Sequence, residues 1–241
     1  MDCRLYLKGL RLPVLRGFVL FVALLCQLAG VAQTADNQRW RDSLTHLNRL
    51  IATQPWSTDV HLRKAAANME LQQWQYAIDE YGTILEHEPH NPAALFYRGY
   101  ASTKLRHYDV ARRDYETLLA RLPRHTEARL SLSYVLQQLG RKTEALDQLN
   151  LLVEQRPDSA VVFASRAALE DELKQHEAAL YDWDQATRLE PLNADYEVSC
   201  VALLLRLKRH GEALRRLDAA SKRGIPPGVL HQWYERARKK R

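Results

Sequence analysis

The chain has 241 residues, 46% of them hydrophobic, and a formal net charge of +6, a composition that is ordinary for a soluble helical protein of one or two domains. The positive charge is concentrated at the two ends. Residues 1–32 carry four cations and one acid, and residues 231–241 carry five cations and one acid. Because the region between them is close to neutral, the charge pattern argues against nucleic-acid binding by the body of the chain.

The first 32 residues have the pattern of an export signal. A basic segment up to Arg16 is followed by an uncharged, mostly apolar run over 17–32, which ends in Gly30-Val31-Ala32. This run is too short for a comfortable transmembrane helix. We therefore expect a signal peptide over 1–32, cleavage after Ala32, and a mature chain that begins at Gln33 and is periplasmic or secreted. An uncleaved membrane anchor is the alternative. Cleavage would leave Cys200 as a lone, buried cysteine.

From residue 43 onward the sequence repeats with a period of 34. Prolines recur at this spacing at Pro55, Pro89, Pro123, Pro157 and Pro191. So do the alanines Ala77, Ala111, Ala145, Ala179 and Ala213, each followed four residues later by a large apolar side chain. A third series is small in four of five places: Ala65, Gly99, Ser133, Ala167 and Val201. Two residues after each proline stand Ser57, Asn91, His125, Ser159 and Asn193, of which we expect all but the histidine to be helix N-caps. A pattern held through five copies indicates a repeat protein.

Each repeat contains two helical patterns joined by a short turn, so its helices are expected to pack antiparallel. The conserved spacing of the alanines marks points where two helix axes approach closely. The predicted organisation is a linker and N-terminal capping helix over 33–57, five repeats over 58–91, 92–125, 126–159, 160–193 and 194–227, and a C-terminal capping helix with a basic tail over 228–241. Such end helices cover the core that a stack of repeats would otherwise expose.

The spacing and the residues resemble the tetratricopeptide repeat family, whose 34-residue unit is a helix–turn–helix. The second helix of each repeat matches the family pattern closely, for example at Ala111, Tyr115 and Pro123. The first helix matches in part, for example at Leu95 and Gly99. The resemblance covers residues 38–226 and implies an all-α fold, a right-handed superhelix of helix–turn–helix repeats (an α-solenoid).

In the resembled family, a ridge on the first helix of each repeat lines a concave groove that contacts peptides. The corresponding candidates for a protein-binding groove are Leu62, Met69, Phe96, Tyr100, Thr103, Leu130, Tyr134 and Gln137. Tyr100 and Tyr134 are one period apart and are expected on adjacent helices. The alternative is that the large side chains close the groove by packing on each other. The Lys/Asn set with which some family members clamp a C-terminal carboxylate is absent, since Leu62, Phe96 and Leu130 occupy its lysine positions.

Charged residues replace an apolar family position in three first helices, and each has an opposite charge 16 residues later. These predicted structural ion pairs are Lys64 with Glu80, Arg98 with Asp114, and Arg166 with Asp182. Charges on a half-buried helix face are costly unless they find partners. We therefore expect each pair to bridge the two helices of its own repeat. In the fifth repeat Cys200 stands opposite Arg216, so no such pair is expected there.

The sequence offers no catalytic constellation. His87 and His90 are three residues apart with Pro89 between them, which is not the spacing of a helical zinc motif. We expect no enzyme activity, no metal and no cofactor. The sequence therefore favours a non-catalytic scaffold outside the cytoplasm that binds a protein or peptide partner in its groove. The alternative is an adaptor whose basic C-terminal tail docks on nucleic acid or an anionic membrane surface.

Overall fold

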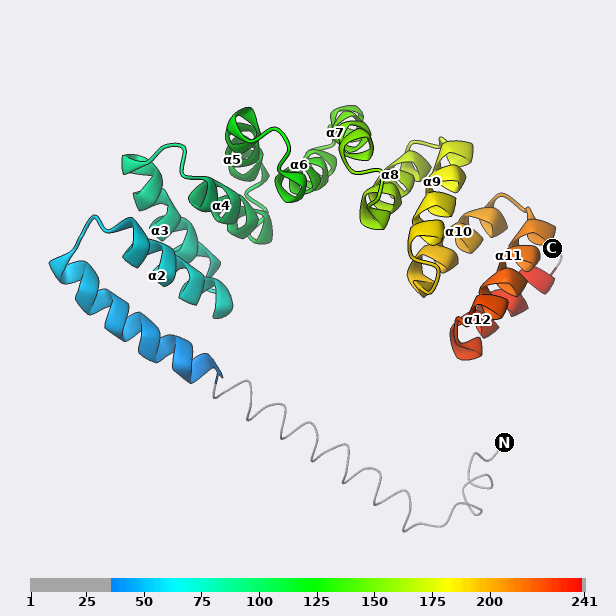
Figure 1. Cartoon of the computed structure of the whole chain (residues 1–241), viewed down its shortest axis with the longest axis horizontal. Helices are drawn as coiled ribbons and strands as arrows, with labels where there is room; N and C mark the ends of the chain where they lie inside the picture. Colours follow the sequence, from blue (N-terminus) through cyan, green and yellow to red (C-terminus); the bar gives the residue numbers. More distant parts are fainter. Residues whose placement is uncertain (1–35, 240–241) are drawn as a thin grey trace, which may run out of the picture. The chain divides into compact units, whose positions relative to one another are not determined.

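The structure is a computed structural model that describes residues 36–239. The predicted signal peptide and the last two residues of the basic tail lie outside the described residues. The described part consists of helices joined by short turns and contains no strand (Figure 1). Within it, no helix combines the length and the apolar character that crossing a bilayer requires.

The chain divides into two compact units, residues 1–89 and 90–241, which are described separately. The first contains a helix over residues 36–53, followed by α2 (Thr58–Glu70) and α3 (Trp74–His87). The second contains α4 (Pro92–Lys104), α5 (Tyr108–Arg121), α6 (Thr126–Gln138), α7 (Lys142–Gln155), α8 (Ala160–Glu172), α9 (His176–Leu189), α10 (Ala194–Arg206), α11 (His210–Arg223) and α12 (Pro227–Arg238). Each predicted 34-residue repeat thus holds one helix pair. In the second unit every helix packs on the next one in the chain, as in an α-solenoid.

The turn inside each repeat has one conformation. The first helix ends at a leucine, and the next residue adopts a left-handed backbone with φ between 55° and 76°; these residues are Gln72, Arg106, Gly140, Lys174 and Lys208. Two backbone hydrogen bonds close the turn. In the first repeat Gln72 N–H donates to the Met69 carbonyl and Gln73 N–H to that of Asn68, at 2.9 and 2.8 Å. This is the Schellman arrangement, which satisfies the last carbonyls of a helix.

Between repeats, a proline ends the second helix. Leu122, the residue before Pro123, has left the helical region with φ −122° and ψ 70°, because the proline ring disfavours a helical conformation in the preceding residue. The next helix is then capped by a side chain. Asn91 Oδ1 accepts from the N–H of Ala94 at 3.0 Å.

One part of the capping prediction is wrong. The Ser159 side chain makes no capping hydrogen bond, whereas His125, which we did not expect to cap, accepts the N–H of Ala128 on Nδ1 at 3.2 Å. An imidazole nitrogen can accept as an oxygen does when its proton sits on the other nitrogen. The His125 ring also stacks on Phe96, with ring centroids 5.3 Å apart, and this contact holds it over the start of α6.

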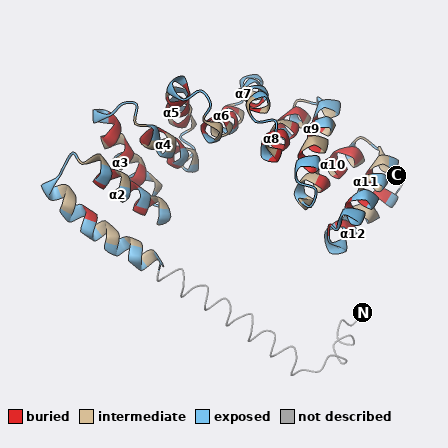
Figure 2. Ribbon diagram, in the orientation of Figure 1, coloured by how far each residue is buried: buried red, intermediate tan, exposed pale blue. Residues whose placement is uncertain are grey.

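The core follows the periodic positions. All five alanines of the conserved series have no exposed surface, and the large side chains one turn later are also buried, as is the small series of the first helices (Figure 2). Gly99 shows why the third series is small. A methyl group placed on Gly99 would lie 2.9 Å from the ring of Tyr115, so the close approach of α4 to α5 leaves no room for a side chain.

The C-terminal end of the stack is covered as predicted. Leu230 and Ala237 on α12 are buried in the core shared with α10 and α11, and Trp233 packs against the same core. A hydrogen bond between His210 Nδ1 and the carbonyl oxygen of Ala237, at 3.1 Å, joins the start of α11 to the last turn of α12.

Candidate functional site

The first helices α4 and α6 are in contact, and a cavity of about 490 Å³ opens beside them. Tyr100 on α4 and Tyr134 on α6 line it, together with Leu130 and Thr103. The two tyrosines retain 37% and 48% of their surface exposed, which is high for large aromatic side chains. Four of the residues predicted to line a groove therefore meet at one cavity. We call this cavity the tyrosine pocket.

The inner wall of the tyrosine pocket is rich in hydroxyl groups. Tyr115 is almost completely buried, and its hydroxyl makes hydrogen bonds with the side chains of Thr103 and Ser131, which also line the pocket. Burial raises the pKa of Tyr115 to about 12, so the phenol stays protonated. The pocket thus combines aromatic walls with fixed polar groups, as binding sites commonly do.

Two cations stand at the pocket: Lys104, whose Nζ lies 4.9 Å from the centre of the Tyr100 ring, and Arg106 in the turn that follows α4. No acidic side chain lines the pocket. Sequence reasoning did not single out these two cations. Their only signal was their place just after the predicted ridge.

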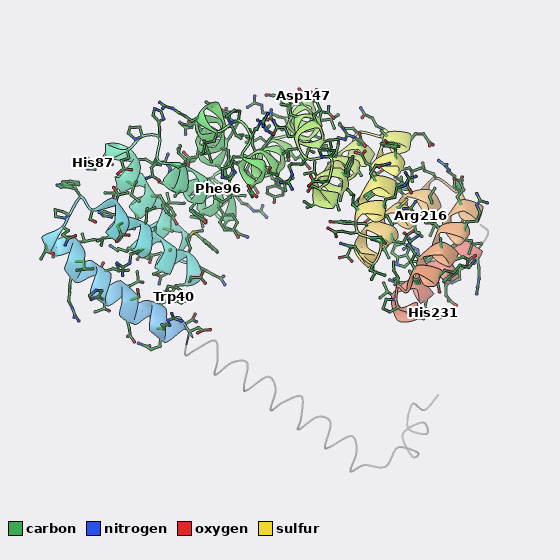
Figure 3. All side chains as sticks on the ribbon, in the orientation of Figure 1. Trp40, His87, Phe96, Asp147, Arg216 and His231 are labelled. Carbon is green, nitrogen blue, oxygen red and sulfur yellow. The ribbon has the colours of Figure 1, made fainter. Side chains whose placement is uncertain are left out.

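The other predicted groove residues are placed differently. Phe96 is half-buried among aromatic rings, 6.0 Å from that of Tyr115 and 5.3 Å from that of His125 (Figure 3). Gln137 is half-buried on α6 and is not part of the pocket lining. Leu62 and Met69 are half-buried on α2, in the first unit.

All three predicted ion pairs are present in the structure, each between the two helices of one repeat. Arg98 Nε and Nη2 donate to the two oxygens of Asp114 at 2.9 and 2.6 Å. Arg166 grips Asp182 in the same two-pronged way, and Lys64 Nζ lies 2.7 Å from Glu80. Asp114 is almost fully buried, and the desolvation raises the pKa of its carboxyl even though Arg98 acts to lower it. Arg166 also reaches out of its repeat, where Nη1 donates to Asn150 Oδ1 at 3.0 Å.

The first, third and fifth repeats contain a second bridge that sequence reasoning missed. It joins helix positions 19 residues apart. His61 Nδ1 lies 2.6 Å from Glu80, and Arg129 Nη1 donates to Gln148 at 2.6 Å. His61 and Arg129 also reach the carbonyl oxygen of the proline that precedes their repeat.

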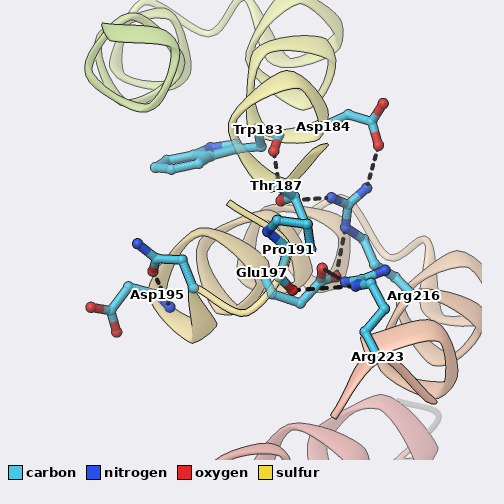
Figure 4. A network of polar contacts seen from close by, with 9 residues as sticks. Trp183, Asp184, Thr187, Pro191, Asp195, Glu197, Arg216 and Arg223 are labelled. Atoms are coloured by element: carbon cyan, nitrogen blue, oxygen red, sulfur yellow. Dashed lines mark hydrogen bonds and ion pairs between the residues drawn. The ribbon is translucent and has the colours of Figure 1, made fainter. Parts of the chain in front are cut away.

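In the fifth repeat the same bridge has its charges reversed. Glu197, with no exposed surface, lies 2.7 Å from Arg216 Nε and pairs with Arg223 (Figure 4). Arg216 also donates to Asp184 and Thr187 on α9, at 3.2 and 3.1 Å. The expectation that pairing lapses in this repeat is therefore wrong: Arg216 finds its acid at Glu197. A buried carboxylate held by two guanidinium groups is a structural feature that fastens α11 to α10 and α9.

Other candidate chemistry does not gather into a site within residues 36–239. No group of three or more His, Cys, Asp or Glu side chains in this range could hold a metal ion. Cys200 is buried and free, and burial raises the pKa of its thiol to about 11, which disfavours the reactive thiolate. In the basic tail, the guanidinium groups of Arg236 and Arg238 lie over the rings of Trp233 and Tyr234, at 4.4 and 5.3 Å.

Comparisons with known proteins agree with this architecture. The family model of the tetratricopeptide repeat matches residues 103–160. No curated protein matches the chain. Among solved structures, the chain is similar to MamA from Desulfovibrio magneticus RS-1, with 18% identity, a TM-score of 0.63, and coverage of 76% of this chain and 97% of that one. It is also similar to YrrB, described as a tetratricopeptide repeat protein with an unusual peptide-binding site, with 18% identity, a TM-score of 0.61, and coverage of 77% and 96%. A tetratricopeptide repeat protein from Parabacteroides merdae shares 19% identity, with a TM-score of 0.57 and coverage of 83% and 78%.

The fold and the family match together define the class: the chain is a tetratricopeptide-repeat protein, an all-α solenoid of helix pairs. Proteins of this family are generally non-catalytic scaffolds that bind protein or peptide partners. The fold thus makes this chain a protein-interaction scaffold.

Proposed function

We propose that the protein is a binding scaffold outside the cytoplasm and that a segment of its partner occupies the tyrosine pocket. The observation that carries this proposal is the pocket itself: about 490 Å³, with Tyr100 and Tyr134 held one repeat apart and both partly exposed. Aromatic side chains that keep exposed surface around a concave site supply large contact areas to a bound chain. The mechanism is binding alone, on a surface that the repeat stack has already formed.

The test is crosslinking in the expressing cell, with a photoreactive residue in place of Ser131 at the pocket wall. The double variant Tyr100→Ala/Tyr134→Ala should lose the crosslinked species that the parent forms. The matched control is Tyr181→Ala, which removes an exposed tyrosine from α9 instead. If the crosslinked species survive the double variant at the level of the control, the pocket is not the binding site.

The proposed location is tested separately, by the mass of the protein recovered from that cell. A chain that begins at Gln33 supports export and cleavage, for which the basic segment and apolar run at the N-terminus are the evidence. A full-length chain that must be extracted from the membrane would overturn cleavage and favour the anchor.

A further inference from the structure

A second concave site lies at the C-terminal end of the stack, between the end of α10 and the last turns of α12. It is a cavity of about 840 Å³ with an apolar floor, Ala202 and Leu205, and four cations around it, Arg206, Lys208, Arg236 and Lys239. We call it the basic cup. Ala202 is in the same repeat position as Tyr100 and Tyr134, exactly two and three periods on, so the cup continues the row of the tyrosine pocket.

The basic cup carries an excess of positive charge. No acidic side chain lines it, although the repeats as a whole are close to neutral. Arg206 is paired with Asp171, and Arg236 lies over the Trp233 ring. Lys208 and Lys239 are exposed, and within residues 36–239 neither forms an ion pair. At least two cations at the cup are therefore available to an anionic ligand.

The two sides of the basic cup are fixed to each other. Helices α10 and α12 are in contact, and the hydrogen bond from His210 to the Ala237 carbonyl ties α12 to the start of α11, beside Lys208. Leu230 and Ala237 anchor α12 in the core. A site with its charges already in place binds with less loss of entropy than one that must be assembled.

We propose that the basic cup binds a carboxylate-rich segment of the partner protein, in which acidic side chains meet the lysines and an apolar side chain rests on Ala202 and Leu205. This inference rests on the proposed function, because it names the chemistry of the partner that the same row of first helices receives. Charge complementarity of this kind selects the partner and speeds its association.

The shape and the lining of the cup favour a protein segment over the other polyanions. A flat membrane surface would meet the rim of a concave site and leave the apolar floor unused. Single-stranded nucleic acid is generally held by aromatic side chains on which bases stack, and the cup lining contains none. The neutral charge of the remaining repeats also offers no extended basic track for a phosphate backbone.

The test measures fluorescence anisotropy of a labelled peptide of glutamates with interspersed leucines, titrated with the full chain. The same peptide with glutamine in place of glutamate is the reference. Lys208→Glu should weaken binding of the acidic peptide about tenfold, and Lys239→Glu on α12 should act in the same direction. The matched control is Lys174→Glu, which makes the same charge change at the same left-handed turn position one repeat earlier, away from the cup lining.

Three results would overturn the proposal. One is equal weakening by Lys174→Glu and Lys208→Glu, which would show a general charge effect. Another is equal binding of the glutamine peptide. The third is tighter, Lys208-dependent binding of a single-stranded oligonucleotide or of phosphatidylglycerol vesicles. The outcome is separable from that of the proposed function: loss of crosslinking in the Tyr100/Tyr134 variant without any effect of Lys208→Glu on the peptide leaves the scaffold function standing and removes the cup.

Discussion

Glu170 on α8 makes the stability of the stack depend on pH. Its side chain is almost fully buried, and its Oε2 has no hydrogen-bond partner. Burial is the main cause that raises its pKa from an ordinary 4.5 to about 7; the negative charge of Asp182 acts in the same direction, and Arg166 opposes both. The folded protein therefore holds a proton on Glu170 at pH values where the unfolded chain has lost it.

The sign follows from this difference. Below about pH 4.5 the carboxyl is protonated in both states, so the group has no effect on the free energy of unfolding. Between pH 4.5 and about 7 the unfolded chain binds fewer protons, so stability falls as the pH rises, and above about 7 the loss is complete. At about 1.4 kcal/mol for each pKa unit, the loss is roughly 3 kcal/mol. Glu170→Gln keeps the shape and removes the charge, so it should be nearly neutral near pH 4 and stabilising by up to roughly 3 kcal/mol at pH 8.

The assay is urea unfolding followed by circular dichroism, for the parent and for Glu170→Gln, across this pH range. Comparing the two chains at each pH cancels the titration of every other group. Glu154→Gln, the same substitution at an exposed position of α7, gives the baseline. A difference between parent and Glu170→Gln that stays constant from pH 4 to 8 would refute the reasoning.

Three further substitutions test the packing. Gly99→Ala should destabilise the protein by about 1–3 kcal/mol in urea unfolding because its methyl group meets the Tyr115 ring, whereas Gly82→Ala, in an open helical position, should stabilise it by up to about 1 kcal/mol; equal effects would contradict the close approach. A double-mutant cycle on Arg98 and Asp114 should give a coupling of about 2–3 kcal/mol, and coupling near zero would mean that the pair does not hold the two helices together. Ala145→Leu should cost about 1–3 kcal/mol and speed hydrogen exchange in α6 and α8 as well as α7, unless the crossing at Ala145 is looser than its complete burial indicates.

Much of the fold was predictable because one period governs it. The prolines and the buried alanines recur every 34 residues, so an error in one copy is corrected by the other four. The ion pairs were predictable for the same reason: Arg98 and Asp114 recur as Arg166 and Asp182, with the same signs and the same spacing.

The contacts that the sequence did not reveal are those whose chemistry changes between copies. The bridge of 19 residues is made by His61, by Arg129 and then by Glu197, a reversal of sign that hides the shared position. The tyrosine pocket could be anticipated from the spacing of Tyr100 and Tyr134. Its hydroxyl groups and the basic cup could not, since they depend on side chains from separate helices that only the folded chain brings together.

The left-handed turns imply a trade-off between robustness and recognition. A residue with a side chain is disfavoured in this conformation by about 1–2 kcal/mol, and Gly140 shows that glycine serves in the same turn. Yet Arg106 stands at the tyrosine pocket and Lys208 at the basic cup. An engineer who replaced both with glycine to raise the melting temperature would obtain a sturdier stack that had given up a cation at each of its two concave sites.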